Sequence, residues 1–132
     1  MSGMFSSCAI TTVPLFDTSK VTDCSYMFMN AQSLQEVPLF DTSKVTNMNS
    51  MFLGCKALTY IPLFDTSKVY SMGSTFSGCL NVQYGALALY RQASTQTTPP
   101  HSHSGTFNNC GINTTTGRAE WNQIPYSWGG NA

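Results

Sequence analysis

The chain has 132 residues, no formal net charge and only 9% charged residues, against roughly 25% in typical domains. A chain this neutral lacks the basic face that tracks a phosphate backbone, so we expect no nucleic-acid partner, and without a run of 18 apolar residues we expect no membrane insertion. The length predicts one domain that can bury a core of its own.

The string PLFDTSKV occurs three times, at Pro14–Val21, Pro38–Val45 and Pro62–Val69, and each copy begins 24 residues after the last. One full unit reads M-F-x-G-C-x-x-L-x-x-I-P-L-F-D-T-S-K-V-x-x-M, seen most completely in residues 51–72. A fixed period of about 20–50 residues is typical of stacked repeats, in which neighbouring units bury each other's apolar faces. The pattern therefore predicts a repeat solenoid over residues 1–84, with about three and a half units.

The amino-terminal stretch MSGMFSSC aligns with MNSMFLGC at Met48–Cys55, so the chain starts in the middle of a unit. Solenoids normally protect their end units, because an uncapped unit exposes core residues to water. We therefore expect either a fragment of a longer protein, or an adjacent domain or subunit that covers the N-terminal rung.

Within a unit, the spacing of Leu58, Ile61 and Leu63 predicts a short extended piece in which Ile61 and Leu63 point inward. Pro62 has no N–H to give to a ladder, so the parallel strands should be only about 2–4 residues long. Val45–Met48 is a second candidate strand. The segment Met51–Cys55 is expected to form a turn of helix or an irregular bend, with its Met, Phe and Cys side chains inside.

The repeated Asp-Thr-Ser-Lys is a turn sequence, since Asp17, Asp41 and Asp65 can each accept the backbone N–H two residues on. A calcium ladder is the alternative. Calcium takes about 6–8 oxygen ligands, and one carboxylate per unit supplies too few, so the structural interpretation is favoured.

Four cysteines, Cys8, Cys55, Cys79 and Cys110, each follow a phenylalanine by three residues. In stacked units such side chains run parallel, which keeps their Cβ atoms farther apart than the ~3.5–4.5 Å of a disulfide. We expect reduced thiols packed in the core rather than disulfides.

The repeat pattern ends after Val82. Gly85–Ser94 predicts a helix that covers the last unit with Leu87, Tyr90 and Ala86. Thr95–Ser104 predicts a loop, because it holds two prolines and little apolar content. The segment Thr106–Gly111 returns to the F-x-x-C half of the motif, and Ile112 is expected to start a last strand.

The sequence Thr116–Pro125 predicts a short helix ended by its proline. Trp121, Ile124 and Trp128 are expected to seal the end of the solenoid. Residues 85–132 are thus predicted to be a helical and irregular capping region, packed on the repeats as part of one domain.

The pieces MF-x-G-C-x-x-L-x-x-I-P and FDTSKVTNM, with the period of 24, resemble the BspA-like leucine-rich repeats of bacterial surface proteins. The resemblance covers about residues 1–82, and residues 85–132 look like a terminal module of bacterial and prophage-encoded proteins. It implies a leucine-rich-repeat-like solenoid, a role in adhesion or recognition, and a place at the bacterial cell surface or on a virion. It transfers no catalytic residues. No signal peptide and no wall or lipid anchor are visible in this chain.

We expect recognition at exposed positions where the copies differ. The candidate binding residues are Gln35, Glu36, Thr59, Tyr60 and Tyr84. Tyr60 and Tyr84 can stack on a sugar or fill a pocket of a partner, so the predicted partner is a protein or glycan on a cell surface. Ordinary solvated surface is the alternative for each residue taken singly.

Two other functions were weighed. The chain can be a structural spacer or tip domain of a phage tail fibre or longer surface protein. An enzyme is not expected, because no paired acid constellation is present and the only histidines are His101 and His103. That H-x-H pair can ligate a metal, but two histidines on a loop make a weak site, so no cofactor is predicted.

Overall fold

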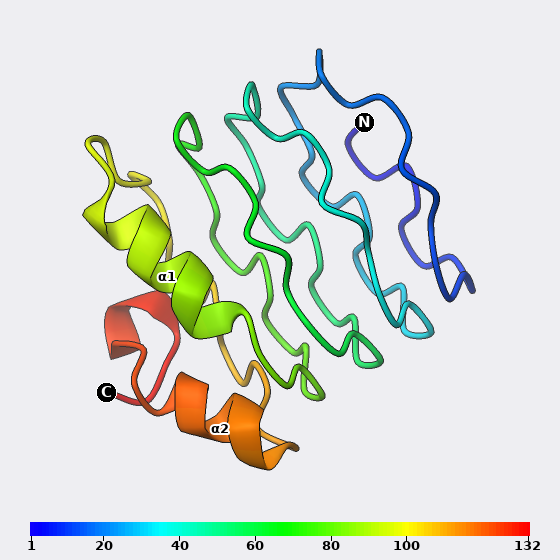
Figure 1. The fold of residues 1–132 in the computed structure, drawn as a ribbon. Helices are drawn as coiled ribbons and strands as arrows, with labels where there is room; N and C mark the ends of the chain where they lie inside the picture. Colours follow the sequence, from blue (N-terminus) through cyan, green and yellow to red (C-terminus); the bar gives the residue numbers. More distant parts are fainter.

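Each 24-residue repeat forms one irregular coil of chain, here called a rung, and successive rungs lie side by side along the molecule (Figure 1). The computed structural model describes residues 1–132. The side-by-side stacking of the rungs confirms the predicted repeat solenoid. Two short α-helices and a single 3-10 turn lie together at the carboxyl-terminal end of the stack.

One stretch of each rung is a chain of tight turns, here called the turn segment. The turn segments are residues 1–8, 24–31, 48–55, 72–79 and 103–110. Within them, every second backbone N–H donates to a carbonyl three residues earlier and closes a local turn, as Met27 N–H does with the Cys24 carbonyl at 3.2 Å. The N–H groups in between donate to carbonyls of the next rung. An example of the second kind is Phe28, whose N–H donates to the Met51 carbonyl at 2.8 Å.

Two residues of every turn segment have a left-handed backbone, which rules out a helix there. The first column is Gly3, Tyr26, Ser50, Ser74 and Gly105, and the second is Ser7, Asn30, Gly54, Gly78 and Asn109. A positive φ at the third position of a four-residue turn is what a type II turn requires. Of the two predictions for Met51–Cys55, the irregular bend is the one that forms, and its Met51, Phe52 and Cys55 side chains are buried as expected.

The core is built from columns of side chains that repeat along the stack. The central column holds five phenylalanine rings in near-parallel contact: Phe5–Phe28 at 5.4 Å between ring centroids, Phe28–Phe52 at 5.3 Å, Phe52–Phe76 at 5.4 Å and Phe76–Phe107 at 5.6 Å. Methionine, cysteine, leucine and valine columns flank it in one continuous cluster of 28 buried residues. Stacking neighbours thus supply the burial that a lone unit cannot reach.

The predicted short strands do not form. The structure has no β-strand and only four isolated parallel bridges: Asp23–Asn47, Asn47–Ser71, Tyr60–Tyr84 and Ser71–Ser102. At the first candidate strand the PLF sequence closes a turn instead, because the Phe64 N–H donates to the Pro62 carbonyl at 2.8 Å. This three-residue turn buries Pro62 and Phe64 and turns Leu63 outward, so the prediction that Leu63 points into the core is wrong. The second candidate, Val45–Met48, forms only isolated bridges, at Asn47.

The Asp-Thr-Ser-Lys turns form as predicted. Each aspartate Oδ1 accepts the N–H of the serine two residues on, at 2.9–3.0 Å. The threonine between them is buried and links neighbouring rungs. Thr18 Oγ1 donates to the Asp41 carbonyl and Thr42 Oγ1 to the Asp65 carbonyl, both at 2.8 Å. The same four residues therefore make a local turn and a link to the next rung.

Acid should weaken these three turns. Hydrogen bonds from the serine hydroxyl and then from the serine amide hold the pKa of Asp17, Asp41 and Asp65 below the ordinary 3.8. A lowered folded pKa contributes stability above the unfolded pKa, and that contribution is lost as the pH falls from about 4 through the folded pKa. Urea unfolding at about pH 6 and at about pH 2 measures how much the free energy of unfolding falls between the two. This fall should be smaller for the triple variant S19A/S43A/S67A than for the wild type. An equal loss in variant and wild type would contradict this cause.

All five cysteines are free, and four of them are buried. The Cys55 and Cys79 thiols donate to the carbonyls of Phe28 and Phe52, at 3.1 and 3.0 Å. Burial raises the pKa of Cys24 to about 11 and that of Cys55 to about 12. The thiols therefore pack as small apolar groups that also satisfy backbone carbonyls.

Helix α1, Ala86–Thr95, confirms the predicted helix over Gly85–Ser94. Its buried residues are Ala86, Leu89 and Ala93, whereas Leu87 and Tyr90 lie at the flank of the core rather than at its centre. Two glutamines complete the last Asp-Thr-Ser-Lys rung. Gln92 Nε2 donates to the Phe64 carbonyl at 2.6 Å, and Gln96 Oε1 accepts from Thr66 Oγ1 at 2.8 Å, where another rung would offer a backbone carbonyl.

A fifth rung follows α1, and it begins inside the predicted loop Thr95–Ser104. The Ser102 N–H donates to the Tyr70 carbonyl at 3.1 Å, and the Met72 N–H donates to the Ser102 carbonyl at 2.8 Å. The end of that stretch is thus a ladder residue rather than loop. No strand starts at Ile112, where the chain continues in turns.

Helix α2, Thr115–Trp121, ends four residues before Pro125, and the 3-10 turn η1, Tyr126–Trp128, follows it. Thr114 caps α2 by accepting the Gly117 N–H at 3.0 Å, and its hydroxyl donates to the Val82 carbonyl, also at 3.0 Å. Ile124 and Trp128 are buried as predicted, and Trp121 is half-buried.

Candidate functional site

The candidate binding residues lie on one strip that runs across the rungs, with Gln35, Glu36 and Tyr84 exposed and with Thr59 and Tyr60 half-buried. Backbone hydrogen bonds fix the register of the strip: Gln35 N–H donates to the Thr11 carbonyl at 2.8 Å, and Thr59 N–H to the Gln35 carbonyl at 3.1 Å. Gln35 and Thr59 therefore share one column, and the residues that follow them in sequence form the next. This second column, named here the variable column, consists of Thr12, Glu36, Tyr60 and Tyr84.

The two tyrosines of the variable column stack on each other. Their ring centroids are 5.8 Å apart with 20° between the planes, and a parallel bridge joins their backbones. Tyr60 is half-buried, and its hydroxyl donates to the Val37 carbonyl at 3.2 Å, whereas Tyr84 is 57% exposed. The pair thus combines a fixed ring with an open one at the surface.

A shallow cleft of about 200 Å³ lies beside Tyr60, lined by Thr12, Val13, Glu36, Val37, Pro38 and Tyr60. The structure therefore brings Glu36 and Tyr60 to one cleft and places Tyr84 one rung away. Gln35 and Thr59 flank the cleft in the neighbouring column, where Thr59 Oγ1 donates to the Gln35 carbonyl at 3.2 Å. Glu36 is exposed and brings the one carboxylate of the variable column.

An exposed leucine stripe was missed by sequence reasoning. Leu15, Leu39 and Leu63 are 68%, 58% and 51% exposed, although they belong to the identical string. The alternation of Ile61 and Leu63 in sequence predicted that Leu63 points into the core, like Ile61. The three-residue turns around Leu39 and Leu63 direct these side chains outward, and no sequence signal marks such a turn beyond its proline.

His101 and His103 line one cleft together with Ser102, Ser104 and Ser127, and each ring stacks on a different aromatic side chain. His101 stacks on Tyr70, with ring centroids 4.9 Å apart, while His103 stacks on Trp128 at 4.1 Å. His103 Nδ1 is also 3.0 Å from the Ser127 carbonyl oxygen. No group of three or more His, Cys, Asp or Glu side chains could hold a metal ion.

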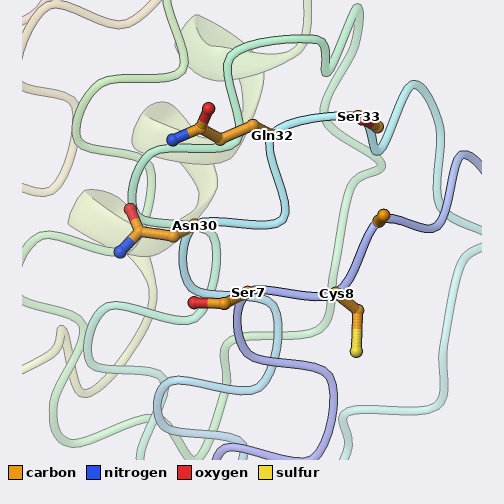
Figure 2. A pocket seen from close by; sticks show the side chains of 6 residues that line it. Ser7, Cys8, Asn30, Gln32 and Ser33 are labelled. Carbon is orange, nitrogen blue, oxygen red and sulfur yellow. The ribbon is translucent and has the colours of Figure 1, made fainter.

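A second cleft, of about 440 Å³, lies between the first two rungs (Figure 2). Its lining is uncharged, and it is polar apart from Cys8 and Ala9; Figure 2 labels Ser7, Cys8, Asn30, Gln32 and Ser33. In Figure 2 the amides of Asn30 and Gln32 point to the same side, and the sulfur of Cys8 points away from them. The labelled side chains do not converge on one point in this view.

A family model described as a Mycoplasma protein of unknown function, DUF285, matches residues 1–109. Among solved structures, the chain is similar to a leucine-rich repeat protein from Bacteroides ovatus ATCC 8483, with 22% sequence identity and a TM-score of 0.43. The match covers 76% of this chain but only 25% of the other, so the chain spans about a quarter of that protein's length. No curated protein matches the chain. None of its helices has the length and apolar character needed to cross a bilayer.

Proposed function

Because the chain belongs to the DUF285 family of Mycoplasma proteins of unknown function, we propose its function from its surface: non-enzymatic recognition of a protein or glycan on a cell surface. The observation that carries the proposal is the stacked and partly open Tyr60–Tyr84 pair. It lies in the variable column, where the units differ in a side chain at the surface.

The different roles of identical and variable positions in the repeat support this proposal. Apart from the exposed leucine stripe, residues that are identical in the units mostly make the turns and the core, as Asp41, Thr42 and Phe40 do. The variable column changes from threonine to glutamate to tyrosine, while the ladder of the neighbouring column continues from Thr11 through Gln35 and Thr59 to Gln83. Aromatic side chains give large contact area at low entropic cost, and the adjacent Glu36 adds a directional polar group. Neither the cleft beside Tyr60 nor the cleft between the first two rungs is lined by a histidine or lysine that could act as a base, so the proposal contains no catalytic step.

The proposed location is outside the cell, at a bacterial surface or on a virion. Its support is the resemblance of the repeat to BspA-like surface proteins. A structural spacer within a longer surface protein or fibre would use the same scaffold and would carry no ligand of its own. The two proposals therefore differ in whether the isolated chain binds anything.

The test is binding of the purified chain to an array of immobilised glycans and to panels of fixed cells. The matched variant is Y60T/Y84T, because Thr12 already occupies this column and shows that threonine fits. We expect a ligand for the wild type and a loss of about tenfold or more in the variant at unchanged melting temperature. Wild-type protein that binds no glycan and no cell would overturn the proposal and favour the spacer.

A further inference from the structure

A separate cleft of about 540 Å³ lies on the side of the solenoid that carries Tyr70 and His101, and its lining does not include the variable column. We propose that this cleft binds a carboxylated pyranose, that is, one acidic sugar residue. The size falls within the range of about 300–1,000 Å³ that is usual for small-molecule pockets. The proposal does not depend on the function proposed for the variable column, because the two sites share no residue.

The cleft has an aromatic platform that breaks a column of small side chains. Thr22, Thr46, Tyr70 and His101 follow one another in this column, joined by backbone bonds such as Tyr70 N–H to the Thr46 carbonyl at 2.8 Å. His101 covers one face of the Tyr70 ring, with 16° between the planes. The opposite face is directed toward the rung of Thr46, whose side chain is much smaller, and Tyr70 remains 60% exposed. The apolar face of a pyranose ring is of the right shape to stack on such an open ring.

The wall of the cleft is made by the insertion that follows α1, and it is held in place. Gln96 Nε2 donates to the Thr98 carbonyl at 3.0 Å and to the Thr66 carbonyl at 2.8 Å, which ties the insertion to the last Asp-Thr-Ser-Lys turn. Pro100 is buried next to this wall, and Pro99 lines the cleft. A site that is already ordered loses little entropy when a ligand binds.

The charge of the lining selects an acidic ligand. Lys68 is the one lysine or arginine in the lining, and no aspartate or glutamate lines the cleft. The nearest carboxylate in this turn, Asp65, accepts the Ser67 N–H at 2.9 Å and does not line the cleft. An ammonium group pairs well with a ligand carboxylate, and the hydroxyls of Thr46, Ser67 and Thr98 can exchange hydrogen bonds with sugar hydroxyls.

The experiment uses saturation-transfer NMR on the full chain with two probes, methyl β-D-glucuronide and the neutral methyl β-D-glucoside. We expect transfer from the protein to the ring protons of the glucuronide, and weaker binding of the glucoside. Y70T should lower the affinity for the glucuronide about tenfold, because threonine is the residue at the two preceding positions of the column and offers no ring face. K68Q should make the two probes bind equally.

The control is Y84T, which changes an exposed tyrosine of the variable column and should leave glucuronide binding as in the wild type. Melting temperatures of all variants confirm that the fold is kept. The proposal is overturned if the wild type shows no transfer to the glucuronide, if Y70T binds it as well as the wild type, or if K68Q keeps the preference for the acidic probe. None of these results would bear on ligands of the Tyr60–Tyr84 pair.

Discussion

Replacing Phe52 by alanine should destabilise the protein by about 3–5 kcal/mol, the cost expected for removing a fully buried aromatic ring. Phe52 is the central ring of the phenylalanine column and lies between Phe28 at 5.3 Å and Phe76 at 5.4 Å. Its rung has neighbours on both sides, so the stacked backbone cannot easily collapse into the space. Urea unfolding of wild type and F52A, followed by circular dichroism, measures the difference.

The matched control is L63A, which removes an apolar side chain from the identical string at a half-exposed position. We expect its free energy of unfolding to stay within about 0.5 kcal/mol of the wild type, because surface changes away from special features cost little. If L63A were as destabilising as F52A, the leucine stripe would be core in solution and the outward turn of Leu63 would be wrong.

Replacing Gly117 by alanine should detach the carboxyl-terminal cap and cost about 3 kcal/mol, the upper end of overpacking effects. Gly117 is buried in α2, and a Cβ there would overlap the Val82 carbonyl oxygen and the Thr114 hydroxyl. Both are parts of the cap-to-rung contact that Thr114 makes. Tryptophan fluorescence reports the change, because Trp121 and Trp128 both lie in the cap.

The direction of this effect is informative, since glycine to alanine in an ordinary helix interior stabilises by roughly 0.5–1 kcal/mol. T116A, at an exposed position of the same helix, is the control and should leave the unfolding transition nearly unchanged. A G117A variant that unfolds later than the wild type would show that α2 does not pack on Val82 in the way described.

The solenoid and its core could be predicted because the same apolar columns recur at a fixed period. Phe28, Phe52 and Phe76 keep the 24-residue step, and stacking is the one arrangement that buries all three rings. The Asx turns at Asp17, Asp41 and Asp65 were predictable as well, because they depend on contacts within three residues.

The local path of the chain was less predictable. Ser50 and Ser74 adopt a left-handed backbone without being glycine, since the rung-to-rung ladder fixes the turn and overrides the residue's own preference. The outward leucines depend on a three-residue turn that no residue type specifies. The positions of His101 and His103 depend on the length of the insertion after α1, which places each ring against a different aromatic side chain.

Of the candidate site, the sequence indicated which residues vary but not how they meet. Glu36, Tyr60 and Tyr84 could be named because they follow the repeat period at exposed positions. Their arrangement, with a stacked pair and a cleft beside Tyr60, depends on ladder geometry that only the structure provides. The Tyr70–His101 cleft could not be found at all, because its wall comes from a segment outside the repeat.

The central claim is that the identical residues of the repeat are scaffold and that recognition occurs in the variable column. Its most direct test is amide chemical-shift mapping of the labelled chain, titrated with the best glycan or surface protein from the binding screen. We expect shifts centred on the amides of Glu36, Tyr60 and Tyr84. Shifts confined to the repeated turns at Ser19, Ser43 and Ser67, with none at the two tyrosines, would contradict it.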